Sequence, residues 1–151
     1  MKLIGKIRLS RIVECCLVGL LILVPILVVS LPWSITWITE RAPSDPYYIR
    51  YFVILAYSGV MGELILWQAR GILHNVNVGK VFSSNTVHRM RTMAVEFLVL
   101  SAFYLATMFW MSKFFMAFLF VCFVLVGCSL FVFAELFAQA NEYKSENDMT
   151  I

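Results

Sequence analysis

Charged residues are scarce in this chain of 151 residues. Asp, Glu, Lys and Arg together make up 14% of the sequence, whereas hydrophobic residues make up 62%. Soluble proteins carry about 25% charged residues, so the composition excludes an ordinary water-soluble domain. The length allows a single domain over residues 1–151.

Metal-binding, redox and catalytic motifs are missing as well. No CxxC or Cys/His spacing occurs, and the cysteines lie inside apolar runs, which is typical of reduced packing thiols: Cys15, Cys16, Cys122 and Cys128. His74 and His88 are too few to indicate a metal site. No pattern pairs a nucleophile with a base. We therefore expect a non-enzymatic protein with no catalytic residue, metal or cofactor.

The chain does contain four long apolar stretches, at about residues 12–38, 50–73, 92–111 and 114–138. Each can cross about 30 Å of hydrocarbon, where only a helix satisfies its own backbone. This pattern predicts an all-α fold, an integral membrane four-helix bundle with a connector at 74–91 and a tail at 139–151. The first stretch exceeds the roughly 7–15 apolar residues of a signal peptide and is expected to be a retained helix.

The basic residues predict the orientation in the membrane, because Lys and Arg favour the cytoplasmic side. Nine of them lie in the N-terminal segment, the connector region and the tail: Lys2, Lys6, Arg8, Arg11, Arg70, Lys80, Arg89, Arg91 and Lys144. Three lie on the other side: Arg41, Arg50 and Lys113. An aromatic belt on that other side agrees: Trp33, Trp37, Tyr47, Tyr48 and Trp110. Both termini are therefore expected to be cytoplasmic.

Carboxylates inside a membrane are candidate functional groups, because burying a charge there costs at least about 2–3 kcal/mol. Glu63 is the deepest, about 18 Å along a helix from Tyr51. The candidate intramembrane polar site consists of Glu63, Glu96, Glu135 and Arg70, with Glu14 closer to the interface. One interpretation is a vestibule that binds an ion, a proton or a peptide. The other, which we favour except at Glu63, is a structural layer of carboxylates and arginines.

The connector at 74–91 holds an apolar aromatic residue, Phe82, in a largely polar segment. Ser83, Ser84 and Asn85 offer N-caps for a helix that starts near Thr86. Phe82 either anchors the connector between helix ends, which we favour, or is presented to a cytoplasmic protein. The candidate partner-contact residues are Phe82, Asn85, Arg89 and Arg91.

Two motifs resemble those of a known family. The first is Gly79-Lys80-Val81-Phe82-Ser83-Ser84-Asn85, followed by His88-Arg89-Met90-Arg91. The second is Ala134-Glu135-Leu136-Phe137 together with the ending at 146–151. With the four-helix layout, they are similar to the DUF2975 family of bacterial membrane proteins, whose function is unknown. The resemblance implies a small multi-pass protein of the bacterial cytoplasmic membrane. It also implies a cytoplasmic partner, because members are often encoded beside an XRE-type helix-turn-helix regulator.

We therefore expect a regulatory or accessory protein that lies in the lipid bilayer and engages such a regulator, without binding nucleic acid itself. The alternative is a small proton- or cation-coupled transporter, or an immunity-type protein, that uses Glu63. Ser58, Gly59 and Gly62 form a strip of small residues beside Glu63. Such strips allow helices to approach closely, which leaves a homo-oligomer open.

Overall fold

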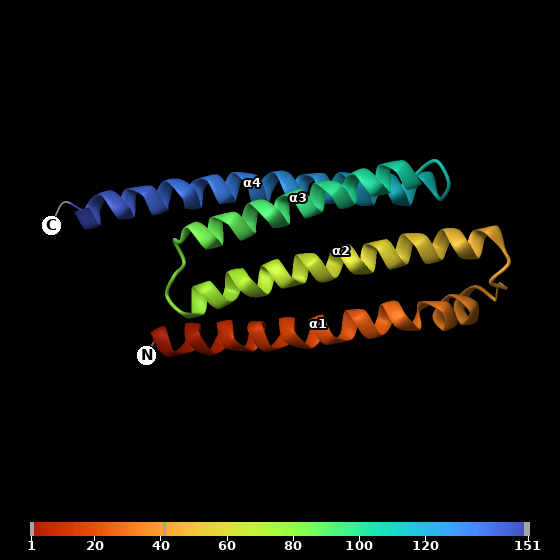
Figure 1. Ribbon diagram of the computed structural model, residues 1–151, viewed down its shortest axis with the longest axis horizontal. Coiled ribbons are helices and arrows are strands. Elements are labelled where there is room, and N and C mark those ends of the chain that lie inside the picture. Colours follow the sequence, from red (N-terminus) through yellow and green to blue (C-terminus); the bar gives the residue numbers. More distant parts are fainter. Residues whose placement is uncertain (1, 41, 150–151) are drawn as a thin grey trace.

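The chain folds into four long helices (Figure 1). The computed structural model describes the backbone of residues 2–40 and 42–149 and the side chains of 10–40 and 42–146. The helices are α1 (Lys2–Thr39), α2 (Pro46–Asn77), α3 (Ser84–Thr107) and α4 (Lys113–Met149). Each is long and apolar enough to cross a membrane, which confirms the predicted all-α class and the four apolar spans. The side chains of Lys2, Lys6, Arg8, Arg41 and residues 147–151, on which some expectations rest, lie outside the described part.

The helices extend beyond the apolar stretches. α3 begins at Ser84, before its apolar stretch at 92 and close to the start near Thr86 that the N-caps predicted, and α4 continues through the polar tail to Met149. The residues that extend α4 include Gln, Ala, Glu and Lys, which favour helix whether or not lipid surrounds them. The connector between α2 and α3 therefore shrinks to residues 78–83.

Local sequence signals set the ends of the helices at this connector. α2 ends before Gly79, which has φ +76°, a left-handed conformation that glycine adopts without steric cost. The Ser83 hydroxyl then accepts a hydrogen bond from the Thr86 backbone amide at 3.3 Å, so α3 is capped as its sequence predicted. At the other end of α2, Asp45 caps the Tyr47 amide at 2.8 Å.

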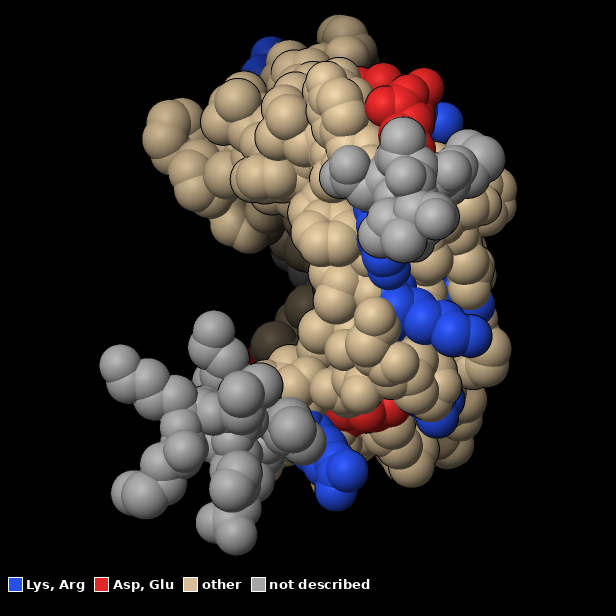
Figure 2. Space-filling model, turned by 90° about the vertical axis from the view of Figure 1, so that its left-hand side faces the viewer, with Lys and Arg blue, Asp and Glu red and all other residues tan. Residues whose placement is uncertain are grey.

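The helices lie side by side in chain order. Among the described residues, Cα atoms of different helices come within 8 Å only between α1 and α2, α2 and α3, and α3 and α4. Both termini and the α2–α3 connector lie at one end, here named the terminal end (Figure 1). Figure 2 looks at this end and shows a hollow along one flank, between the lobe of α3 and α4 and the lobe of α1 and α2. The arrangement is therefore more open than the four-helix bundle expected from sequence.

The apolar core joins α2, α3 and α4. Its buried members are Ile54, Met61, Leu100, Tyr104 and Met116. Between α3 and α4, Ala94 and Ala134 are completely buried, and such small side chains let two helices approach closely. By contrast, the most apolar window of α1 contains no buried residue. The apolar side chains of α1 therefore suit contact with lipid.

Candidate polar site at the terminal end

α1 and α2 are joined by a polar contact around Glu14. Its carboxylate accepts a hydrogen bond from the Asn77 side-chain amide at 2.5 Å and lies 3.4 Å from Nδ1 of His74. The Ser10 hydroxyl donates to the Asn77 side-chain oxygen. Glu14 thus links α1 to α2. His74 and Asn77 were not predicted from the sequence as the partners of Glu14.

α2 and α3 are joined around Arg89. Nη1 of this arginine donates to the side-chain oxygen of Gln68 at 3.2 Å, and the carboxyl group of Glu96 on α3 lies near the same Gln68 side chain. Arg89 crosses directly over Gly71, where an added Cβ would lie only 2.4 Å from Nη1. Arg89 therefore extends toward α2 instead of outward, although the sequence made it a candidate partner contact.

α3 and α4 are joined by an ion pair. Nη2 of Arg91 lies 2.9 Å from Oε2 of Glu135, and the two side chains are 50% and 61% exposed. Exposed ion pairs contribute only about 0–1 kcal/mol to stability. This pair therefore orients side chains more than it stabilises the fold.

The polar residues at the terminal end thus link successive helices pair by pair. Glu14 is linked to α2 through Asn77. Glu135, the one of these acids that meets an arginine within the described part of the chain, is linked to α3 through Arg91. In the described part of the chain, no three His, Cys, Asp or Glu side chains gather closely enough to hold a metal ion.

Glu63 is placed differently from the other acids. It lines an apolar cavity of about 270 Å³ between α1 and α2, together with Val24, Pro25, Val28, Val29, Gly59, Val60 and Leu64. Its Oε2 atom is buried without a hydrogen-bond partner among the described residues. A buried polar atom without a partner is costly. Oε2 of Glu96 is buried without a partner as well, but of these two acids only Glu63 lines this apolar cavity.

Polar contacts fix the connector between the end of α2 and the start of α3. The Thr86 hydroxyl is completely buried and accepts a hydrogen bond from the Asn75 amide at 3.1 Å. Phe82 packs on Phe137 of α4, with ring centroids 5.4 Å apart, yet remains 44% exposed. Phe82 therefore contacts α4 well before that helix ends, while part of its ring is accessible.

A cleft of about 330 Å³ lies beside this connector, between the start of α3 and the extension of α4. It is lined by Ser84, Val87, His88, Arg91, Ala138 and Asn141. His88 and Arg91 make it basic, and His88, like Asn85 next to the cleft, is exposed. Of the candidate partner-contact residues, Phe82, Asn85 and Arg91 are accessible from this side, whereas Arg89 is directed toward α2.

A second, smaller cavity of about 220 Å³ lies between α2 and α3. Its lining consists of Trp67, Arg70, Gly71, His74 and Arg89. Arg70, predicted as part of the intramembrane polar site with the three acids, thus lies with two other basic side chains and no acid. The sequence contains a sign of this grouping, because the spacing of residues 67, 70, 71 and 74 places their side chains on one face of a helix.

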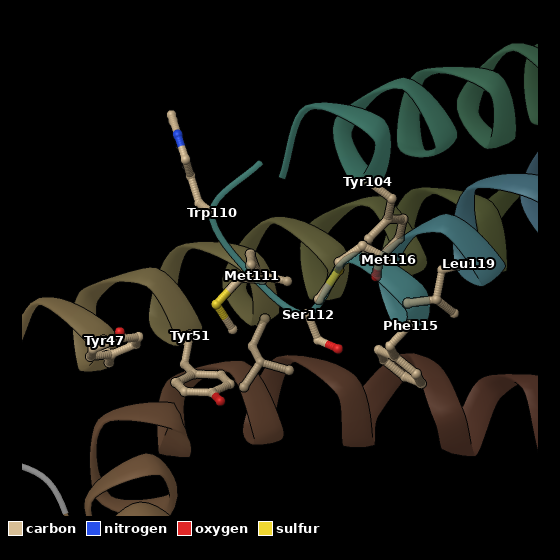
Figure 3. A pocket seen from close by; sticks show the side chains of 11 residues that line it. Tyr47, Tyr51, Tyr104, Trp110, Met111, Ser112, Phe115, Met116 and Leu119 are labelled. Carbon is tan, nitrogen blue, oxygen red and sulfur yellow. The ribbon is translucent and has the colours of Figure 1, made fainter. Parts of the chain in front are cut away.

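At the opposite end, a larger cavity of about 690 Å³ lies between α2 and the start of α4. Figure 3 shows its side chains: Tyr47, Tyr51, Ile54, Leu55, Tyr104, Trp110, Met111, Ser112, Phe115, Met116 and Leu119. The Tyr104 hydroxyl is 2.7 Å from the Ser58 hydroxyl, so its polar atom is already satisfied. Aromatic and methionine side chains dominate, which makes this cavity suited to apolar contacts and not to acid–base chemistry.

The sequence model of one family, described as a protein of unknown function (DUF2975), matches residues 34–151. No curated protein and no solved structure matches the chain. The family match covers α2, α3 and α4 and the last turns of α1. It therefore includes every residue that lines the two basic cavities, but neither Ser10 nor Glu14.

Proposed function

This chain belongs to the DUF2975 family, and we propose that it is a non-enzymatic docking protein of the bacterial cytoplasmic membrane. Its terminal end faces the cytoplasm and holds a soluble partner of regulatory type. The helix-turn-helix regulator implied by the family resemblance is the partner we favour. The observation that carries the proposal is the extension of α4 beyond its apolar span, beside the cleft at the start of α3.

Length supports a part of α4 outside the bilayer. About 20 helical residues cross 30 Å of hydrocarbon, whereas α4 contains 37 residues and starts directly after the turn at the opposite end. Its last turns therefore continue past the membrane and carry exposed side chains such as Tyr143, which is 68% exposed. A rigid helix beside a cleft offers a partner a surface that needs little ordering on binding.

The chemistry of the cleft indicates the kind of contact. His88 and Arg91 give it a basic wall, and Asn141 adds an amide on the α4 side. An exposed aromatic residue, Phe82, lies on the neighbouring connector. Basic and aromatic groups around a small cleft suit an acidic or polar segment of a protein partner.

Site-specific photocrosslinking in living cells tests the proposal. We would place a photoreactive amino acid at His88 or Asn141 and, as control, at Val29, which is 71% exposed on the apolar surface of α1. The expected result is a crosslink to one soluble DNA-binding protein from the two cleft positions and none from Val29. Crosslinks from neither cleft position, or the same crosslinks from all three positions, would contradict docking at the cleft.

A second candidate is a proton- or cation-coupled transporter that uses Glu63. The buried, unpartnered Oε2 of Glu63 inside an apolar cavity favours this alternative. Replacing Glu63 by Gln keeps the shape of the side chain but removes its charge. Loss of ion flux in proteoliposomes with Glu63→Gln, with the cleft crosslinks unchanged, would support transport. Unchanged ion flux in Glu63→Gln, or no ion flux in the wild type, would refute the transport hypothesis.

A further inference from the structure

The cavity between α2 and α3 concentrates positive charge without any acidic side chain in its lining. Arg70, His74 and Arg89 contribute the basic groups, and Trp67 and Gly71 complete the wall. Among the described residues, no hydrogen bond or ion pair joins Arg70 to another side chain. Converging cations near a membrane surface are unfavourable unless an anion lies between them.

Arg89 is held in place from two sides. Its Nη1 donates to Gln68 at 3.2 Å, and its Nε is buried without a hydrogen-bond partner among the described residues. Gly71 allows this position, because any larger residue would collide with the guanidinium group: an added Cβ would lie 2.4 Å from Nη1 and 2.8 Å from Nε. Because Nε is buried and Nη1 already donates to Gln68, Nη2 is the guanidinium nitrogen that can donate to a ligand in the cavity. The guanidinium group is thus pre-positioned.

His74 presents the cavity with only one of its nitrogens. Nδ1 lies 3.4 Å from the carboxylate of Glu14 on α1, which leaves Nε2 available to a ligand. Glu96 lies near Gln68, the acceptor of the Arg89 hydrogen bond, and is not part of the lining. Neither Glu14 nor Glu96 therefore lines the cavity.

We propose that this cavity binds a phosphate group, and that in the bilayer the phosphate belongs to the headgroup of an anionic phospholipid. Two guanidinium groups and an imidazole are donors that match phosphate oxygens, and arginine is favoured where phosphate is bound in a forked geometry. Trp67, which is 58% exposed, lies one turn before Arg70, as aromatic residues do at the level of lipid headgroups. Basic cavities between membrane helices are typical sites for such headgroups.

The surface around the site agrees with a lipid ligand. Figure 2 shows Lys and Arg side chains gathered on the side of the terminal end away from the hollow. A lipid can reach a cavity at this level laterally from the bilayer, with its acyl chains along the apolar surfaces of the helices. This inference goes beyond docking of a soluble partner, and its test needs no partner protein.

The test measures lipid binding to the full-length protein in non-ionic detergent by native mass spectrometry. Phosphatidylglycerol is titrated against phosphatidylcholine, whose choline cation the basic cavity should disfavour. Arg70→Gln is expected to weaken phosphatidylglycerol binding at least about tenfold, because hydrogen bonds between charged groups are lost. Arg11→Gln removes a charge at the same end of the protein but outside the cavity. This control should change affinity less than about fivefold.

Gly71→Ala is the sharper variant, since it preserves every charge and only displaces Arg89. Alanine is the better helix former, so this variant should fold. The matched control is Gly62→Ala on the same helix, where an added Cβ meets nothing within 4 Å. We expect about tenfold weaker lipid binding for Gly71→Ala and unchanged binding for Gly62→Ala.

Three results would overturn the proposal. The first is equal affinity for the two lipids, and the second is wild-type affinity in both Arg70→Gln and Gly71→Ala. The third comes from a parallel titration with inorganic phosphate. If free phosphate binds in an Arg70-dependent manner and phosphatidylglycerol does not, the ligand is a soluble anion and the lipid assignment is wrong.

Discussion

The contact between Glu14 and Asn77 provides a quantitative test of the polar layer at the terminal end. If the layer is structural, this hydrogen bond should stabilise the packing of α1 on α2. The perturbation is a double-mutant cycle with Glu14→Leu, Asn77→Leu and the double variant. Asn77 also bonds Ser10, but that loss occurs in both backgrounds and cancels in the cycle.

The expected coupling energy follows from the geometry. Hydrogen bonds between membrane helices average about 0.6 kcal/mol and reach about 1.7 kcal/mol. A carboxylate acceptor roughly doubles the strength of such a bond. The bond is short, at 2.5 Å, and the Glu14 side chain is only 25% exposed. We therefore expect a coupling of about 1.2 kcal/mol. The contact of Glu14 with His74 is lost with Glu14→Leu in both backgrounds and also cancels in the cycle.

The assay is equilibrium unfolding of purified protein by sodium dodecyl sulfate in mixed micelles, followed by tryptophan fluorescence. The control cycle uses Arg91 and Glu135, whose exposed ion pair should couple more weakly, by about 0.5 kcal/mol. A coupling below about 0.5 kcal/mol for Glu14 and Asn77 would not differ from simple additivity. That value, or stronger coupling in the exposed pair, would refute the structural interpretation.

Two further outcomes are expected. Gly59→Leu should destabilise the protein by about 1–3 kcal/mol in the same unfolding assay, because even an added Cβ there lies 2.4 Å from Cγ2 of Val28. At Gly62 an added Cβ meets nothing within 4 Å, so an equal loss of stability in Gly62→Leu would contradict the close contact at Gly59. In a cysteine-free background, an impermeant maleimide should label Ser44→Cys in intact cells and Ser145→Cys only after lysis. Labelling of both in intact cells would contradict cytoplasmic termini.

Much of the fold follows from the sequence because the bilayer imposes strong rules. Apolar length predicts the four spans, and the hydroxyl of Ser83 predicts the start of α3. Helix ends outside the apolar spans follow a different rule, namely helix propensity and capping. The extension of α4 past residue 138 was therefore not visible in a hydrophobic pattern.

The partners of the polar residues were harder to predict. Composition placed acids and bases at one end, but the rotation of each helix decides which of them meet, and neighbouring residues on a helix point about 100° apart. Arg89 illustrates this, because only Gly71 on the facing helix allows its inward course. Likewise, the link of Glu14 to Asn77 depends on the register of α1 against α2, which no local motif encodes.

Among the described residues, close backbone contacts between helices join only helices that follow one another in the chain, and this has a consequence for how the protein is made. Each of these backbone contacts forms between segments that leave the ribosome one after the other. Chains with such local contacts fold quickly, because little loop entropy is lost before contacts form. The hairpin of α1 and α2 can therefore pack before α3 and α4 are made, and α3 and α4 then complete the apolar core on α2.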